Sequence, residues 1–249
     1  MVDEYLKLAK KAAVEAGNFL VDRVDIQVDK SIGRDLKLSS DKESERLIID
    51  CLSASNLPVL SEECGMIGES DGLRWIVDPL DGTVNYYRGI DDLCCVSIAL
   101  FDNNEPVLGV VNRFKSNELY TGVVGQSAEL NGRPIEVSKV TKMEDAVLST
   151  GYPTGMDYSE ESLKNYIQLV RRAKKTRMLG SATLMATFVA CGKTDMYFEK
   201  DIMLWDVAGA MAIVKAAGGA VRLKSGSSDY KCDFGAFSSK ALMEEFYGF

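Results

Sequence analysis

The stretch WIVDPLDGT, residues 75–83, decides the fold and the chemistry that this sequence predicts. Its apolar start predicts a strand that delivers Asp78 at its end, and Pro79 is expected to stop that strand because proline cannot donate to a β-ladder. Gly82 permits a tight turn, and its N–H can approach an anion closely. Asp78 and Asp81 can therefore converge on a hard cation such as Mg²⁺, which prefers oxygen ligands. Either aspartate alone would indicate only an ordinary Asp-Gly turn.

Three further acidic positions lie where carboxylates can be presented to the same site. Glu62 follows a short predicted strand, Asp206 is expected to be the N-cap of a helix, and Asp41 falls in the first turn of another helix. Each has an ordinary structural explanation: Glu62 could lie in a solvated loop, Asp206 could simply cap its helix, and Asp41 could interact with the helix dipole. Together with the two aspartates of residues 75–83, they favour a metal centre.

Outward from this stretch, the first part of the chain predicts two helices against an antiparallel meander. Helices are expected over 3–24 and 40–56, the second opened by a capping box in which Ser40 is the N-cap and Glu43 its partner. The polar residues 27–39 predict a loop or hairpin. Strands are expected near 59–60, 74–77, 93–100, 106–113 and 118–124, with a hairpin turn at Asn131-Gly132.

The rest of the chain alternates strands and helices. Strands are expected near 146–150, 177–179, 195–198 and 220–223, and helices near 159–175, 181–191, 206–217 and 239–247. This alternation predicts a layered α/β fold, α+β in its order of elements, with alternating layers of helices and sheets. The pattern changes near residue 145, from an antiparallel meander to alternating strands and helices. We therefore predict one domain over residues 1–249, built of two halves that meet there.

Composition excludes several classes of protein. The chain has 249 residues, a net charge of −8, no histidine and six cysteines. Without histidine there is no Ser-His-Asp or Cys-His hydrolase and no His-ligated zinc, and no cysteine pair has Cys-x-x-Cys spacing. The absence of a long apolar run or a basic face predicts a cytoplasmic protein that binds neither membrane nor nucleic acid, and makes a metal-dependent nuclease improbable.

The sequence is similar to the inositol monophosphatase family, the lithium-sensitive, magnesium-dependent phosphatases. The resemblance rests on DPLDGT at 78–83, WDVAG at 205–209 and the terminating Gly218-Gly219, with Glu62-Glu63 at the position of the family's acidic pair. It extends from the first helix to Gly219. It implies a layered sugar-phosphatase fold, two or three Mg²⁺ ions per site, a small phosphate ester as substrate, and a homodimer.

The resemblance also implies which residues hold the metal. Asp78 would bridge two Mg²⁺ ions. Glu62 and the carbonyl of Leu80 would complete the first ion's site, and Asp81 and Asp206 the second's. Histidine is not needed for this chemistry, because two metal ions can activate water and neutralise the phosphate oxygens.

Further residues are implied in catalysis and phosphate binding. The backbone N–H groups of Gly82 and Thr83 would hold the phosphate. Thr83 would also orient the attacking water, with Asp41 or Glu62 as its partner. Lys30, eleven positions before Asp41, would approach the phosphate or a third, weaker metal.

Contacts to the rest of the substrate are implied at three places. Glu199, seven positions before Asp206, would accept hydrogen bonds from ring hydroxyls. The turn Gly180-Ser181-Ala182 would face the polyol, although Ser181 is also predicted as the N-cap of its helix. Asp81 would border the same pocket.

Inositol monophosphate hydrolysis is the leading predicted activity. Fructose 1,6-bisphosphatase or dual-specificity activity is the main alternative, followed by histidinol-phosphate and 3′-phosphoadenosine phosphatase activities. A different class is a catalytically silent interaction protein, since some bacterial relatives bind transcription machinery. The complete acidic set favours an enzyme.

Overall fold

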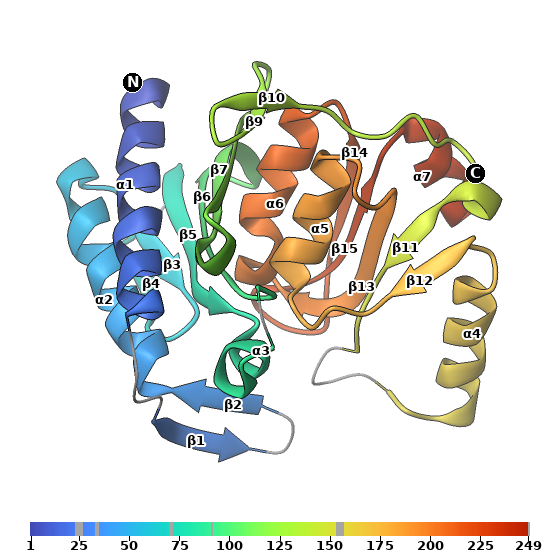
Figure 1. Ribbon diagram of the computed structural model, residues 1–249, viewed down its shortest axis with the longest axis horizontal. Coiled ribbons are helices and arrows are strands. Elements are labelled where there is room, and N and C mark those ends of the chain that lie inside the picture. The colour runs from blue at the N-terminus through green and yellow to red at the C-terminus, as the bar shows by residue number, and fades with distance from the viewer. Residues whose placement is uncertain (23–26, 33–34, 70–71, 91, 153–156, 249) are drawn as a thin grey trace.

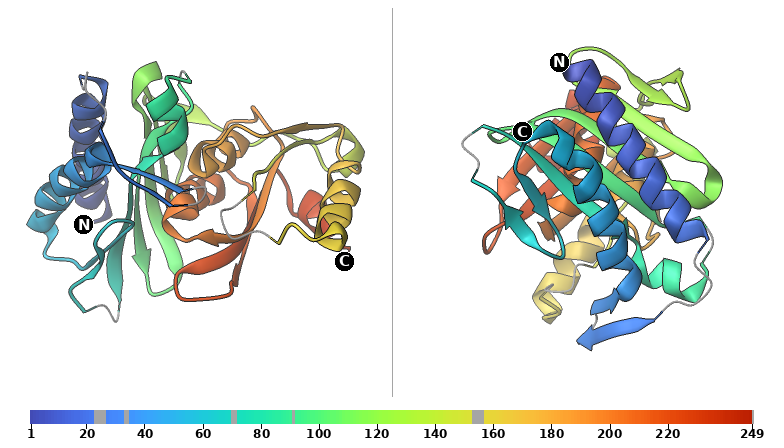
Figure 2. Two further views of the ribbon diagram at one scale, coloured as in Figure 1. Left: turned by 90° about the horizontal axis from the view of Figure 1, so that it is seen from below. Right: turned by 90° about the vertical axis from the view of Figure 1, so that its left-hand side faces the viewer.

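Layers of helices and sheets alternate through the molecule, as the sequence predicts (Figure 1). The computed structural model describes residues 1–22, 27–32, 35–69, 72–90, 92–152 and 157–248. Helices α1 and α2 form one outer layer, α5 and α6 lie between two sheets, and α4 and α7 lie beyond the smaller sheet (Figures 1 and 2). The fold is therefore a layered mixture of α and β structure.

The larger sheet is covered on one face by α1 (Val2–Val21) and α2 (Ser39–Leu52). In the described residues it has the strand order β10-β9-β8-β7-β6-β5-β3-β4. Its strands are β3 (Val59–Ser61), β4 (Gly65–Ile67), β5 (Leu73–Asp81), β6 (Cys95–Asp102), β7 (Glu105–Arg113), β8 (Glu118–Val123), β9 (Ala128–Leu130) and β10 (Arg133–Ile135). The Asn131-Gly132 turn joins β9 to β10 with positive φ at both residues, so this prediction is confirmed.

The smaller sheet has the order β12-β11-β13-β15-β14 among the described residues. Its strands are β11 (Val147–Ser149), β12 (Lys175–Arg177), β13 (Met196–Met203), β14 (Ala220–Ser225) and β15 (Lys231–Phe237). The helices of this part are α4 (Glu160–Val170), α5 (Ala182–Ala190), α6 (Trp205–Ala216) and α7 (Lys240–Tyr247). The sequence analysis missed β15, although its start, Lys231 to Phe234, alternates polar and apolar residues, and it pairs with both β13 and β14.

Three smaller pieces complete the chain. The hairpin of β1 (Val28–Ile32) and β2 (Asp35–Leu38) occupies part of the polar stretch 27–39. The short helix α3 (Thr83–Arg88), which the sequence did not predict, follows Gly82. Short 3₁₀ turns occur at Ser53–Ser55, Phe114–Ser116 and Met143–Asp145.

The prediction that Pro79 stops its strand is wrong. β5 continues to Asp81, because the ladder with β6 passes from the Asp78–Ser97 pair to the Asp81–Cys95 pair through an irregularity. Proline is tolerated at such a bulge, where its missing N–H breaks no ladder bond.

Two predicted helix caps are also corrected. Helix α2 begins one residue early, at Ser39, with Leu38 as its N-cap in place of Ser40. Leucine has no side-chain acceptor, so only one half of a capping box forms, with Asp41 in place of Glu43. The Leu38 N–H donates to Asp41 Oδ2 at 2.8 Å. Asp206 lies in the first turn of α6, which begins at Trp205, and is not the N-cap.

Helix α6 lies unusually close to the larger sheet because two glycines meet there. A side-chain carbon on Gly109 of β7 would collide with the carbonyl oxygen of Gly209 on α6, and one on Gly209 would reach Ser97 Oγ at 2.5 Å. Since α6 carries Asp206, this approach determines how near that carboxylate comes to β5.

None of the helices in the described ranges is long and apolar enough to cross a membrane.

Candidate functional site

Four carboxylates from three separate parts of the fold come together beside the bulge of β5. Asp78 and Asp81 lie on the bulge itself, Glu62 follows β3, which pairs parallel to β5, and Asp206 lies on α6. Asp78 is buried, and the other three are partly exposed. The structure thus brings together the side chains that the sequence assigns to the metal.

The four carboxylates oppose one another's ionisation. Burial raises the pKa of Asp78 well above its ordinary value, and the charges of Glu62, Asp81 and Asp206 raise it further. The pKa of Asp206 is raised by burial and then by Glu62 and Asp81. Burial also raises the pKa of Glu62. Close carboxylates of this kind lack a compensating positive charge, which a bound cation would provide.

The donor set fits Mg²⁺, which takes carboxylate and carbonyl oxygens and retains water. In the described parts of the chain, however, no group of three or more Cys, Asp or Glu side chains is arranged to hold a metal ion as it stands. The four carboxylates are close enough to oppose one another's ionisation, but no three of them converge on one coordination point in the described residues.

Asp81 is held in place by the start of α5. The Ser181 hydroxyl donates to Asp81 Oδ2 at 2.6 Å, and the Thr183 N–H donates to the same oxygen at 2.8 Å. Burial raises the pKa of Asp81, and these hydrogen bonds lower it. Ser181 also accepts from the Leu184 N–H at 3.2 Å, so the N-cap prediction is confirmed.

Thr183 is a positioning residue that sequence reasoning missed. Besides its bond to Asp81, its hydroxyl donates to the backbone carbonyl of Asp206 at 2.6 Å. It therefore joins the two aspartates that are implied to share one metal ion. Its place two residues after Ser181, in the first turn of α5, was the signal that could have identified it.

The β5 bulge is held by hydrogen bonds from three sides. The Leu80 N–H donates to Asp78 Oδ1 at 3.0 Å, and the Thr83 hydroxyl donates to the Leu80 carbonyl at 3.0 Å. From α2, the Ser44 hydroxyl donates to the Pro79 carbonyl at 2.8 Å. The Leu80 carbonyl, a predicted metal ligand, therefore already has one donor.

The loop after β3 is fixed by groups that the sequence did not single out. Glu45 Oε1 accepts from the N–H groups of Glu63 and Cys64 at 3.1 and 3.2 Å. Lys37 Nζ lies 2.7 Å from Glu63 Oε1. These contacts determine the position of Glu62 between Glu63 and the end of β3.

Asp41 lies at the edge of this cluster with one oxygen unused. Its Oδ2 accepts from Leu38, whereas Oδ1 is buried and has no hydrogen-bond partner in the part of the chain that is described. Burial, and then the charge of Glu63, raise the pKa of Asp41 to about 7. A carboxyl with this pKa can exchange a proton near neutral pH.

Gly82 adopts a conformation that only glycine takes readily. Its φ is 84°, and a side-chain carbon would lie 2.5 Å from the Leu93 carbonyl oxygen. Asn85 Nδ2 donates to that same carbonyl and to the carbonyl of Leu179, both at 2.8 Å. Asn85 thus ties the DPLDGT turn to the turn that begins at Gly180.

A cavity of about 300 Å³ adjoins the cluster. The predicted residues that line it are Asp81, Gly180, Ser181, Ala182, Glu199 and Asp206. Lys30 is paired with Lys37 in the β1–β2 hairpin, and its side chain lies outside the described part of the structure. The residues predicted to contact a polyol therefore share a cavity with two of the predicted metal ligands.

Glu199 is buried on the wall of this cavity. Only 6% of the residue is exposed. Burial raises its pKa from 4.5 to about 8, the nearby Tyr197 hydroxyl lowers it, and the charge of Asp81 raises it. Between about pH 4.5 and pH 8, therefore, the Glu199 carboxyl is protonated in the native protein but ionised in the unfolded chain.

This pKa difference predicts how stability depends on pH. In chelator, the native protein binds the Glu199 proton more tightly than the unfolded chain does. Its stabilising contribution is therefore complete below about pH 4.5 and is lost as pH rises toward about 8. The free energy of unfolding should fall by up to roughly 1.4 kcal/mol per pH unit in that window.

The Glu199→Gln variant should remove this dependence, since glutamine does not titrate. The difference in free energy of unfolding, variant minus wild type, should therefore be larger at pH 8 than at pH 5 when both are measured by urea denaturation. The exposed Glu144→Gln is the control for the loss of a carboxylate. An equal difference at both pH values would contradict the assignment.

Comparison with known proteins shows which family this site occurs in. The model of the "Inositol monophosphatase family" matches residues 1–246. The chain is 37% identical to "Nus factor SuhB" of Xylella fastidiosa, over 90% of this chain and 80% of the relative. It is 36% identical to "Inositol monophosphatase 3" of Solanum lycopersicum, over 91% of this chain and 88% of the relative.

A solved structure has the same fold. The extragenic suppressor protein suhB of Bartonella henselae superposes with a TM-score of 0.85 at 31% identity, covering 98% of this chain and 96% of that one. The layered arrangement therefore occurs in a protein of similar sequence.

Proposed function

This chain belongs to the inositol monophosphatase family, and we propose that it is a Mg²⁺-dependent phosphatase that hydrolyses the phosphate monoester of a small polyol or sugar, with inositol monophosphate as its main substrate. The observation that carries the proposal is the group of four carboxylates, Glu62, Asp78, Asp81 and Asp206, beside a cavity of about 300 Å³. Their uncompensated negative charge suits a divalent cation and opposes direct binding of a phosphate.

Asp78 would bridge two Mg²⁺ ions, with Glu62 and the Leu80 carbonyl on one and Asp81 and Asp206 on the other. Bound Mg²⁺ supplies a Lewis acid for the phosphate oxygens and lowers the pKa of a bound water. The hydrogen bonds from Ser181 and Thr183 both end on Asp81 Oδ2. The other oxygen, Oδ1, would then be the one that binds the cation.

Asp41 would accept a proton from the attacking water, and Thr83 would orient that water. Asp41 has an unpartnered buried oxygen and, in the metal-free protein, a pKa of about 7, so it can accept a proton from water at neutral pH. Thr83 would accept a hydrogen bond from that water while its own hydroxyl continues to donate to the Leu80 carbonyl. Glu62 is the other carboxylate that could act with Thr83 on the attacking water.

The phosphate would lie against the backbone N–H groups of Gly82 and Thr83, and Lys30 is the further contact that the family resemblance implies. The close approach of Gly82 to the Leu93 carbonyl keeps a side chain out of this region. An unobstructed backbone of this kind can come within hydrogen-bond distance of an anion.

The polyol would occupy the cavity between Glu199 and the Gly180-Ser181-Ala182 turn. Because the Ser181 hydroxyl is already bonded to Asp81, we assign the substrate contact to the backbone of this turn. Glu199 would then be the side chain that orients a hydroxyl group.

The test is phosphate release with Mg²⁺ from inositol 1-phosphate, fructose 1,6-bisphosphate, histidinol phosphate and adenosine 3′,5′-bisphosphate. We expect inositol 1-phosphate to give the highest kcat/KM. A higher value for fructose 1,6-bisphosphate would favour the sugar-phosphatase alternative. No release from any of them would contradict the enzyme proposal and favour an interaction role, a class that the name of the Xylella fastidiosa relative also suggests.

A further inference from the structure

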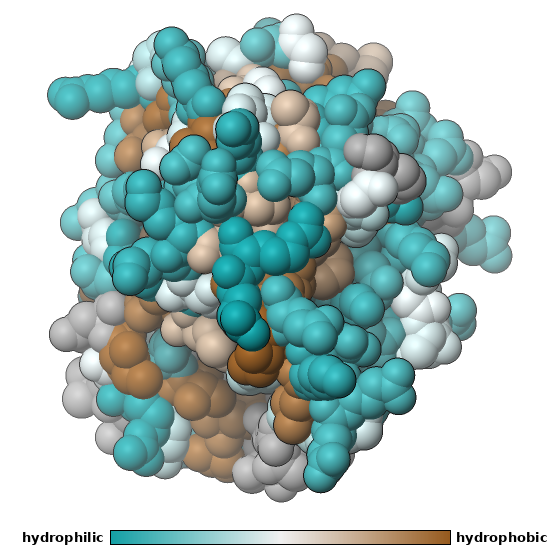
Figure 3. Space-filling view, turned by 90° about the vertical axis from the view of Figure 1, so that its right-hand side faces the viewer, coloured by the Kyte–Doolittle hydropathy of each residue, from teal (hydrophilic) through white to brown (hydrophobic). Residues whose placement is uncertain are grey.

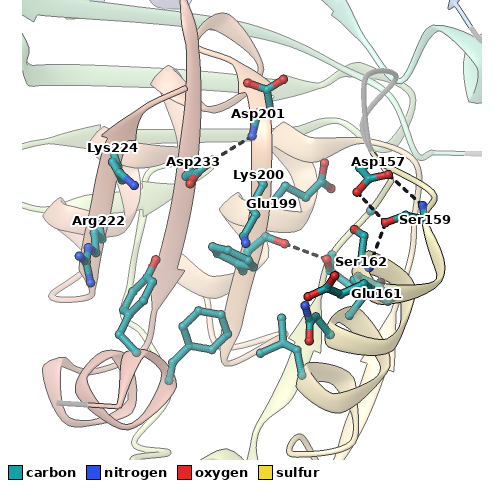
Figure 4. A pocket seen from close by; sticks show the side chains of 18 residues that line it. Asp157, Ser159, Glu161, Ser162, Glu199, Lys200, Asp201, Arg222, Lys224 and Asp233 are labelled. Atoms are coloured by element: carbon teal, nitrogen blue, oxygen red, sulfur yellow. Dashed lines mark hydrogen bonds between the residues drawn. The ribbon is translucent and has the colours of Figure 1, made fainter. Parts of the chain in front are cut away.

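The carboxylate cluster has different surroundings on its two sides. Toward α4, the substrate cavity continues into a larger cavity of about 740 Å³ between α4, the smaller sheet and α7 (Figure 4). Hydrophilic side chains cover most of the outer face there (Figure 3). On the other side, next to α2 and α3, lies the β1–β2 hairpin (Figure 1). The hairpin is therefore the element that approaches the cluster from the side away from α4.

The hairpin is a small sheet of its own. Among the described residues, its two strands pair with each other and with no third strand. Lys30 of β1 and Lys37 of β2 are direct partners in the register, so whatever fixes the backbone of Lys37 also fixes that of Lys30. A two-stranded hairpin is only marginally stable by itself in water. Its position and its order must therefore come from contacts with its surroundings.

An ion pair on each strand ties the hairpin to its surroundings. On β1, Asp29 Oδ2 lies 2.9 Å from Lys42 Nζ of α2, and these side chains are 31% and 61% exposed. On β2, Lys37 Nζ lies 2.7 Å from Glu63 Oε1, and these side chains are 31% and 6% exposed. Exposed pairs contribute little because water screens them, whereas leaving one partner of a buried pair alone is costly. The Lys37–Glu63 pair is therefore the stronger of these two attachments.

Glu63 is the residue directly after the predicted metal ligand Glu62. The Glu63 N–H donates to Glu45 of α2 at 3.1 Å, and the Glu62 N–H donates to the Val77 carbonyl of β5 at 3.3 Å. One peptide unit therefore separates the ion pair with the hairpin from a carboxylate of the cluster. A movement of Glu63 would be transmitted to Glu62, because the planar peptide between them leaves few soft dihedral angles.

The charge of Lys37 also reaches the acids on both sides of it. Burial and the charge of Glu63 raise the pKa of Glu62, and the charge of Lys37 lowers it. The pKa of Asp41, which is raised chiefly by burial, is likewise lowered by the charge of Lys37. Lys37 therefore lies close both to the loop of Glu62 and to the start of α2.

We propose that Lys37 is a positioning residue whose ion pair with Glu63 fastens the β1–β2 hairpin to the loop that presents Glu62. The inference rests on the proposed function in one respect, which is that Glu62 binds Mg²⁺. Docking of the hairpin and binding of Mg²⁺ would then be coupled. Such coupling is reciprocal, so a docked hairpin raises the affinity for the cation, and a bound cation stabilises the docked hairpin.

Hydrogen exchange in the hairpin tests the docking without any substrate. The variant Lys37→Met/Glu63→Gln removes the ion pair and leaves the net charge beside the cluster unchanged. In chelator, the amides of β1 and β2 should exchange about 5- to 20-fold faster in this variant than in wild type, as measured by mass spectrometry. Added Mg²⁺ should slow this exchange more in wild type than in the variant. Equal exchange in the two proteins would overturn the inference.

Mg²⁺ binding tests the coupling. The dissociation constant for Mg²⁺, measured by calorimetric titration, should rise about 5- to 20-fold in Lys37→Met/Glu63→Gln. At saturating Mg²⁺, kcat for inositol 1-phosphate should fall less than about 3-fold, since the variant removes no group that contacts the reacting atoms. A lower kcat with an unchanged affinity for Mg²⁺ would contradict a positioning role.

Two further variants also keep the net charge. Lys37→Glu/Glu63→Lys rebuilds the pair with its charges exchanged, and it should bring hairpin exchange and Mg²⁺ affinity to within about 3-fold of wild type. Lys215→Met/Glu105→Gln removes another long-range pair, in which Nζ and Oε2 are 2.9 Å apart and Lys215 is 30% exposed, and it should change neither quantity. No recovery in the exchanged pair, or an equal effect in the Lys215 variant, would overturn the inference.

Failure of this inference can be told apart from failure of the proposed function. Faster hairpin exchange of Lys37→Met/Glu63→Gln in chelator supports the ion pair as the attachment of the hairpin, even if no ester is hydrolysed. Hydrolysis of inositol 1-phosphate together with equal hairpin exchange in the two proteins leaves the proposed function intact and overturns the role of Lys37.

Discussion

Replacing Asp78 with asparagine is expected to lower turnover by roughly 10³-fold or more on every substrate. Asp78 is the most deeply buried of the four carboxylates, and its pKa is raised by each of the other three. Asparagine keeps the oxygen that can accept from the Leu80 N–H but loses the charge that would bridge two cations. The effect should fall on kcat, because metal activation of water supplies much of the rate.

The same substitution should leave the fold intact. In chelator, the Asp78→Asn protein should be at least as stable as wild type at pH 8, because it removes one of four mutually repelling carboxylates. Asp102→Asn, at the exposed end of β6, is the matched control and should keep wild-type turnover. Near wild-type turnover in Asp78→Asn would show that Asp78 is not a metal ligand.

Removing divalent metal from the wild-type protein is expected to abolish phosphate release, and added Mg²⁺ should restore it. The acids of the site raise one another's pKa instead of forming an ordinary acid–base pair, and the chain has no histidine to take a proton. Without the metal, Asp41 could still accept a proton, but nothing would neutralise the phosphate oxygens or stabilise the leaving oxygen.

Metal removal should also be visible without substrate. Mg²⁺ at 100 times its dissociation constant would stabilise the native state by about 2.7 kcal/mol, and the melting temperature should rise accordingly. This rise should be much smaller in Asp78→Asn. Full activity in chelator, or equal stabilisation of the two proteins by Mg²⁺, would be incompatible with a metal centre at these carboxylates.

Some local features of this protein could be predicted from short stretches of sequence because they depend on neighbouring residues. The Asn131-Gly132 turn and the Ser181 N-cap are of this kind, since each is defined by backbone groups within a few positions. The prediction that the strand ends at Pro79 was wrong, because a bulge depends on the partner strand β6, which the local pattern does not contain. The division of the domain near residue 145 stays a prediction.

The sequence by itself determined the chemical composition of this site: carboxylates as the available ligands, no histidine, and two motifs, DPLDGT and WDVAG, that identify the family. Only the tertiary structure decided how these groups act together. The Gly109–Gly209 contact brings α6 and Asp206 toward β5, and Thr183 connects Asp206 to Asp81. The pKa of a carboxylate depends on its burial and on the charges around it, and those are set by residues distant in the chain.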